Sequence, residues 1–165
     1  MELLTYILLI FFSLQVKASE DPILRLEFFQ KHEDCIIERK YIYLDREIKT
    51  IYEREINQAF ESSIIKRYQM NCLGQISKVY ILSDRVRSHY QTLLIQISKE
   101  RIQVLEVLKF SEPQKYQAPK SWYHKFVTRS DSEIFNIDAV TGATLTRYST
   151  MRMAKKALFL ESKNL

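Results

Sequence analysis

A run of small and hydroxyl residues near the C-terminus is the part of this sequence best suited to chemistry. Residues 138–146 read Asp-Ala-Val-Thr-Gly-Ala-Thr-Leu-Thr, and Gly142 is one of only two glycines in 165 residues. Glycine normally makes up about 7% of a chain, and it accepts a positive φ at little steric cost. Because the sequence otherwise almost avoids glycine, Gly142 indicates a special backbone position.

A helix is predicted directly after this run. Apolar residues recur from Leu145 at three- and four-residue spacing up to about Ser162, namely at Tyr148, Met151, Ala154, Ala157 and Leu158. Thr144 is then expected at or near the helix start, where Thr is a favoured N-cap. The first turn of a helix carries unpaired N–H groups and partial positive charge, and this combination binds phosphate. On spacing alone, an ordinary threonine cap after a turn glycine is the favoured interpretation, with a phosphate site as the alternative.

The exact residues of the run resemble a known motif. Asp138, Thr141, Gly142, Ala143 and Thr144 occupy every fixed position of the flavinylation motif of the FMN-binding domain family. In that motif Asp is followed by two variable residues, Ser or Thr, and Gly-Ala-Thr. The family includes a domain of the sodium-translocating NADH:quinone reductase and related domains in electron-transport complexes.

The resemblance implies a covalent cofactor. In the family, the last Thr of the motif, here Thr144, is joined to the phosphate of FMN by a phosphoester bond. A separate flavin transferase makes that bond from FAD and releases AMP. A Thr hydroxyl is a weak nucleophile that needs a base and a metal to attack a pyrophosphate, and the sequence contains no obvious apparatus for this. The resemblance further implies that Asp138 is recognised by the transferase, and that Thr141 hydrogen-bonds the flavin phosphate or the turn backbone. Gly142, Ala143, Leu145 and Thr146 complete the expected cofactor-binding set within the motif.

Two residues upstream belong to segments that also resemble short family members. Glu112 lies near the end of the segment 104–113, and Trp122 lies in the segment 121–126; the likeness extends roughly from Gly74 to Leu160. Trp122 is expected either to stack beside the isoalloxazine ring, because flat rings stack well, or to lie in the core. Glu112 is expected to orient the flavin or to close a turn. Arg147 and Arg152 are candidates for neutralising the flavin phosphate, with a solvated helix face as the simpler interpretation.

The N-terminus is predicted to be a signal peptide. The apolar run over residues 3–14 is short beside the roughly 20 residues of a membrane span, and Val16-Lys17-Ala18 fits a cleavage site. Residues 1–18 are therefore expected to be removed, which leaves residues 19–165 as a single FMN-binding domain. The acidic Glu2 is unusual for a signal peptide, and a buried helix and an uncleaved anchor are the alternatives. Export would place the protein in the periplasm or on the outer face of the cytoplasmic membrane.

Charge and cysteine content narrow the expected partners. The net charge of +5 is dispersed, and the sequence contains no nucleic-acid motif, so no nucleic-acid partner is expected. Export would place Cys35 and Cys72 in an oxidising compartment, where a disulfide and two buried thiols are both open alternatives. His32, His89 and His124 share no ligand spacing. No metal site is therefore expected.

The coarse pattern predicts an α+β fold, with a small, mostly antiparallel sheet flanked by helices. A short helix is expected over residues 22–30. A second helix is expected to be capped by Asp45 and to carry an apolar stripe that reaches Phe60. Val79, Ile81 and Val86 are expected to face the core, as are Leu93, Ile95 and Ile97. Residues 128–136 are expected to form a polar loop. Strands are predicted at 35–44, 64–68, 77–86, 91–98 and 102–110, with short connections that favour antiparallel pairing.

These observations together predict an exported flavoprotein that carries FMN on Thr144 and relays electrons. No catalytic residues of its own are expected, because no nucleophile–base pair, phosphate-binding loop or dinucleotide motif is visible. Its expected partners are the flavin transferase and a redox protein or a membrane electron-transfer complex. Two alternatives stay open: a flavin-dependent reductase acting on a small substrate, and a non-redox binding module that has kept the fold.

Overall fold

The computed structural model describes residues 21–60 and 62–163, which divide into two compact units, one ending at Asp34 and the other beginning at Cys35. The first unit holds η1 (Pro22–Arg25) and α2 (Glu27–Gln30). The single helix expected over residues 22–30 is therefore wrong, because Leu26 adopts an extended conformation with φ −61° and ψ 141° between the two turns. The predicted signal peptide, residues 1–18, lies outside the described residues. The prediction of one domain over residues 19–165 stays a prediction.

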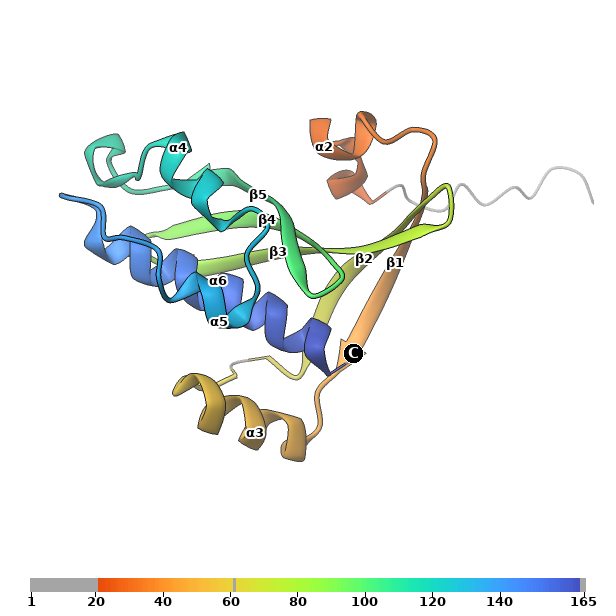
Figure 1. Cartoon of the computed structure of the whole chain (residues 1–165), viewed down its shortest axis with the longest axis horizontal. Coiled ribbons are helices and arrows are strands. Elements are labelled where there is room, and N and C mark those ends of the chain that lie inside the picture. The colour runs from red at the N-terminus through yellow and green to blue at the C-terminus, as the bar shows by residue number, and fades with distance from the viewer. Residues whose placement is uncertain (1–20, 61, 164–165) are drawn as a thin grey trace, which may run out of the picture. The chain divides into compact units, whose positions relative to one another are not determined.

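The second unit is built on a five-stranded antiparallel sheet whose strands follow one another in chain order (Figure 1). Its strands are β1 (Ile36–Tyr43), β2 (Ile64–Cys72), β3 (Gln75–Arg85), β4 (Tyr90–Ser98) and β5 (Arg101–Phe110). The α+β class and the antiparallel pairing predicted from the short connections are confirmed. Cys35 and Cys72 form a disulfide that joins the residue before β1 to the end of β2.

Two helices of this unit follow their sequence signals closely. Helix α3 (Arg46–Ile56) begins after Asp45, whose carboxylate accepts a hydrogen bond of 2.8 Å from the Ile48 amide. It ends at Asn57, which has a positive φ of 56°, so Phe60 lies outside the helix that was expected to include it. Helix α6 (Thr144–Ser162) runs across β3 and β4 on one face of the sheet (Figure 1). Within the described part of the chain, no helix has both the length and the apolar character that crossing a membrane requires.

The core between α6 and the sheet agrees with the sequence on one strand and only in part on its neighbour. Leu93, Ile95 and Ile97 of β4 are fully buried in it, as expected. On β3 the expected Val79 is fully buried, and Val86 after the strand is buried too, whereas Ile81 is only half-buried. The β3 residues in the cluster beneath α6 are Tyr80 and Leu82, because they stand directly opposite Ile95 and Leu93 in the antiparallel register.

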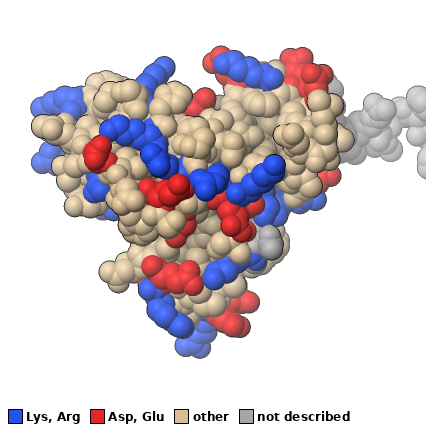
Figure 2. Space-filling view, viewed as in Figure 1, with Lys and Arg blue, Asp and Glu red and all other residues tan. Residues whose placement is uncertain are grey.

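The segment after β5 contains four short helical turns: η2 (Gln114–Tyr116), α4 (Lys120–Tyr123), η3 (His124–Phe126) and α5 (Asp131–Ile134). The polar loop expected over residues 128–136 is wrong, since α5 lies inside it. Ser130 and Glu133 form a capping box at the start of α5, in which each side chain bonds the other residue's backbone. Lys and Arg are interspersed with Asp and Glu over the face drawn in Figure 2, as the dispersed charge of the sequence suggests.

Candidate functional site

The loop of motif residues before α6, called the motif loop below, contains one position whose backbone conformation favours glycine. Gly142 has a φ of +79°, and a Cβ built on it would meet no atom within 4 Å. Space is therefore available for a side chain, and the backbone conformation alone favours glycine there. The turn is closed by the amide of Ala143, which donates to the carbonyl of Val140 at 3.1 Å.

Thr144 lies one residue further into the helix than its expected capping role requires. The N-cap position is held by Ala143, and no side chain caps the helix. The interpretation of Thr144 as an ordinary cap is therefore wrong, because Thr144 is already the first helical residue. Its side chain is exposed, and no described residue hydrogen-bonds its hydroxyl. The backbone N–H groups of the first turn have no acceptor within the helix itself.

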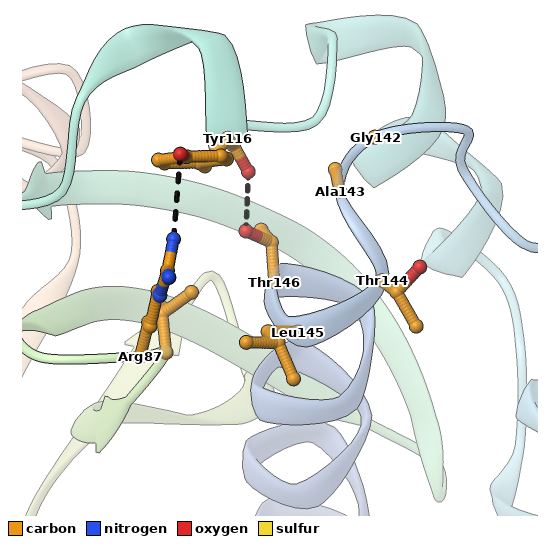
Figure 3. A pocket seen from close by; sticks show the side chains of 8 residues that line it. Arg87, Tyr116, Gly142, Ala143, Thr144, Leu145 and Thr146 are labelled. Carbon is orange, nitrogen blue, oxygen red and sulfur yellow. Dashed lines mark hydrogen bonds between the residues drawn. The ribbon is translucent and has the colours of Figure 1, made fainter.

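A cavity of about 200 Å³ opens beside this first turn (Figure 3). Three separate segments form its wall: the loop after β3, the turn η2, and the start of α6. Thr144 and Leu145 belong to the lining, and both are exposed. The lining residues are Val86, Arg87, Tyr116, Gly142, Ala143, Thr144, Leu145 and Thr146.

Arg87 and Tyr116 form the side of the cavity that faces α6. The Arg87 guanidinium donates to the Tyr116 hydroxyl at 3.3 Å and lies 5.7 Å from the centre of the Tyr116 ring. Thr146, which is 1% exposed, donates its hydroxyl to the Tyr116 carbonyl at 2.5 Å. Figure 3 shows Thr146 pointing towards Tyr116, whereas the side chain of Thr144 projects away from the Arg87–Tyr116 pair. Thr146 therefore fastens the cavity wall to the helix.

Glu112 closes the turn that carries Arg87. Its buried carboxylate accepts hydrogen bonds from the backbone amides of Ser88 and His89 at 2.5 and 2.7 Å. The bond from the His89 amide holds the pKa of Glu112 below its ordinary value, so the carboxylate stays ionised. Of the two roles expected from the sequence, the structure favours turn closure.

Trp122 is buried and hydrogen-bonds the backbone of the motif loop. The indole ring is 3% exposed and packs edge-on against Tyr123 and Phe126, with centroids 5.2 and 5.1 Å away. Its Nε1–H donates to the carbonyl of Asp138 at 2.9 Å. This places Trp122 in the core, the second of its two expected positions, and a direct contact with the flavin stays a prediction. The side chain of Asp138 is exposed and lies 3.3 Å from the Lys125 ammonium.

A buried polar group that was not predicted from the sequence holds the start of α6 onto β4. The side-chain amide of Gln91, which is 0% exposed, donates to the hydroxyls of Ser149 and Thr150 at 3.0 Å each. The Tyr123 hydroxyl donates to the side-chain carbonyl oxygen of Gln91. Burial raises the pKa of Tyr123 to about 12, which keeps that hydroxyl protonated. Gln91 has the same alternation phase as Leu93, Ile95 and Ile97, and a polar residue in that apolar phase was the available signal.

The two arginines proposed for the flavin phosphate have protein partners. Arg152 pairs with Asp84 at 2.6 Å and donates to the Arg85 carbonyl, so its charge is already matched. Arg147 donates to the carbonyl of Ile137 at 3.2 Å and thereby ties the motif loop to the helix. Arg87, which the sequence did not single out, is the arginine that lines the cavity.

The family comparison covers most of this region. Residues 90–159 match the family model of the FMN-binding domain. The match agrees with the family that the motif resembles. The match begins at the first residue of β4 and runs into α6, so it includes Glu112, Tyr116, Trp122 and the motif, while Arg87 precedes it. The match supports FMN as the cofactor, which is the cofactor that the motif predicted. No curated protein and no solved structure matches the chain.

Proposed function

We propose that this protein carries FMN on Thr144 through a phosphoester bond and relays electrons outside the cytoplasm. The observation that carries the proposal is the exposed hydroxyl of Thr144, which has no partner among the described residues and lies at the mouth of a cavity on the first turn of α6. An outside enzyme can reach such a hydroxyl without unfolding the domain.

The residues around Thr144 suit a phosphate diester. The free N–H groups of the first helical turn favour negative charge, and Gly142 leaves the approach clear of side chains. In the attachment step, the Thr144 oxygen bonds to the FMN phosphorus of FAD while the pyrophosphate bond breaks. AMP leaves, and the hydroxyl proton passes to a base of the flavin transferase. Asp138, exposed in the motif loop, is available for the transferase to recognise.

The size of the cavity favours electron relay over a reductase with an enclosed substrate. Small-molecule pockets usually measure about 300–1,000 Å³, whereas this one holds about 200 Å³. Such a cavity would leave part of FMN outside and provide no room for a second ligand. FMN, when bound, supplies the reversible acceptance of electrons. The chain positions it where a redox protein or a membrane electron-transfer complex can approach.

Placement outside the cytoplasm draws support from the disulfide between Cys35 and Cys72. Disulfides persist in oxidising compartments and are rare in the cytosol. Cofactor lost there would be hard to replace, and a covalent bond would prevent its loss. We therefore propose export, with the flavin in the periplasm or on the outer face of the cytoplasmic membrane.

Fluorescence after denaturing electrophoresis tests the attachment. The protein is co-expressed with a flavin transferase as the wild type and as the variants Thr144→Ala and Thr144→Ser. We expect a fluorescent band for the wild type and for the variant that keeps a hydroxyl, and none for Thr144→Ala. Thr50→Ala, which changes an exposed threonine on α3, is the matched control and should remain fluorescent. A fluorescent Thr144→Ala band would contradict the proposal.

A further inference from the structure

Two cations lie near the ring of Tyr116, and one of them, Arg87, lines the cavity together with Tyr116. The Arg87 guanidinium lies 5.7 Å and the Lys115 ammonium 5.1 Å from the centre of the Tyr116 ring. Neither cation has a carboxylate partner among the described residues, in contrast to Arg152, Arg101 and Lys78, which all pair with acids. Like charges brought together without an anion are unfavourable unless something offsets them. The arrangement points to an anionic ligand beside Tyr116.

This cationic wall is held in place by buried groups. Glu112 fixes the turn that carries Arg87 through two backbone amides, and Thr146 fixes Tyr116 through its carbonyl. The backbone turn that carries Arg87 is therefore fixed, and the bond from its exposed guanidinium to the Tyr116 hydroxyl connects it to α6 through Thr146. A preorganised charge of this kind stabilises negative charge without reorganisation when that charge develops.

The phosphate of FMN is the less suitable anion for this wall. In the proposed function it is bonded to Thr144, whose side chain projects away from Arg87 and Tyr116 (Figure 3). The ribityl chain of FMN separates its phosphate from its ring. A bound ring would therefore lie away from the Thr144 oxygen. Tyr116 and Thr144 line the same cavity, so the ring could reach Tyr116 from this attachment point.

We infer that Arg87, with Lys115 near the same Tyr116 ring, binds the isoalloxazine ring and stabilises its reduced, anionic form. This inference rests on the proposed function. A bound ring reduced by two electrons from a redox protein, or from dithionite in the experiment, and by one proton at N5 would carry its negative charge over N1 and the C2 carbonyl oxygen. Arg87 would donate to both atoms, since a guanidinium presents several N–H groups in one plane.

Midpoint potentials of the loaded protein test the inference. We expect Arg87→Gln to lower the preference for reduced over oxidised flavin by about fivefold to tenfold, a fall of about 20 to 30 mV for a two-electron couple. Arg87→Lys should retain most of the potential because it keeps the charge. Arg54→Gln removes an exposed arginine on α3 and should leave the potential unchanged. Equal potentials for Arg87→Gln and the wild type would overturn the inference.

Intact mass separates this result from the fate of the covalent bond. All four proteins should gain the same mass, because Arg87 is not expected to act in attachment. If the wild type gains none, the attachment is contradicted, and the same proteins are titrated with free FMN and free riboflavin, oxidised and reduced. The inference then requires Arg87→Gln to weaken the binding of both reduced flavins more than the binding of the oxidised flavins. An effect on FMN alone would assign Arg87 to the phosphate, and a wild type that binds no flavin would contradict both proposals.

Discussion

The two ends of α6 differ sharply in exposure and in chemistry. At the N-terminal end, Thr144 and Leu145 are exposed and line a cavity. At the C-terminal end, the four residues from Ala157 to Leu160 are each at most 4% exposed. There Phe159 packs edge-on against Tyr52 of α3 with centroids 5.1 Å apart. One helix thus combines an open end with a packed end.

The difference teaches how this fold separates chemistry from stability. The buried end supplies the apolar contacts that fix the helix, so the open end is free to expose the Thr144 hydroxyl and amides that have no acceptor within the helix. Between them, Gln91 bonds Ser149 and Thr150 and ties the second turn of the helix to β4. Substitutions at the packed end should reduce stability without changing flavin attachment. Substitutions at the open end should change flavin attachment without reducing stability.

The largest stability effect is expected at the packed end. Phe159→Ala removes a nearly fully buried ring and should lower the free energy of unfolding by about 3–5 kcal/mol. Chemical denaturation measures this, while fluorescence on a denaturing gel should show that the protein that still folds carries flavin. Leu145→Ala at the open end is the matched control and should change stability by about 0.5 kcal/mol or less. Comparable losses at both ends would break the contrast between them.

A smaller effect is expected from the link between the two ends. Gln91→Leu leaves the hydroxyls of Ser149, Thr150 and Tyr123 without their buried partner, and this should cost about 1–3 kcal/mol. Because the link positions the first turns of α6, we also expect slower attachment of flavin to Thr144 in co-expressed protein. Unchanged attachment in Gln91→Leu would show that the packed end positions Thr144 by itself.

The smallest effect is expected from acid. Bonds from the Ser130 hydroxyl and amide, together with Arg101, lower the pKa of Glu133 to about 2, and the pKa of Glu112 is lowered as well. Groups whose pKa is depressed on folding stabilise the protein above their unfolded pKa, near 4.5 for Glu. This contribution should be lost as the pH falls from about 4.5 towards 2. Thermal unfolding between these pH values should show a shallower decline for Glu133→Gln than for the wild type, and parallel declines would contradict the assignment.

The sequence predicted the open end of α6 better than the walls around it. Strand positions followed from apolar runs between turns, and the motif located Thr144. Val79 was predicted as buried, but Tyr80 and Leu82 were missed, because all four residues from Val79 to Leu82 are apolar and alternation could not choose between the two phases. Only pairing with β4 decides it.

The remaining misses have a shared physical cause. Arg87 reaches the cavity because Glu112, 25 residues later in the sequence, holds its turn, and no local pattern encodes that contact. Gln91 similarly acquires its role from hydroxyls on α6. Helix α5 is different, since the Ser130 and Glu133 spacing of its capping box is a local signal that the sequence does contain.

The most direct test of the central claim is the mass of the tryptic peptide 130–147 from protein co-expressed with a flavin transferase. The peptide contains Thr141, Thr144 and Thr146, so fragmentation can distinguish the three hydroxyls. We expect a peptide heavier by one FMN less one water, with fragment ions that place the added mass on Thr144. An unmodified peptide, or an added mass on Thr141 or Thr146, would contradict it.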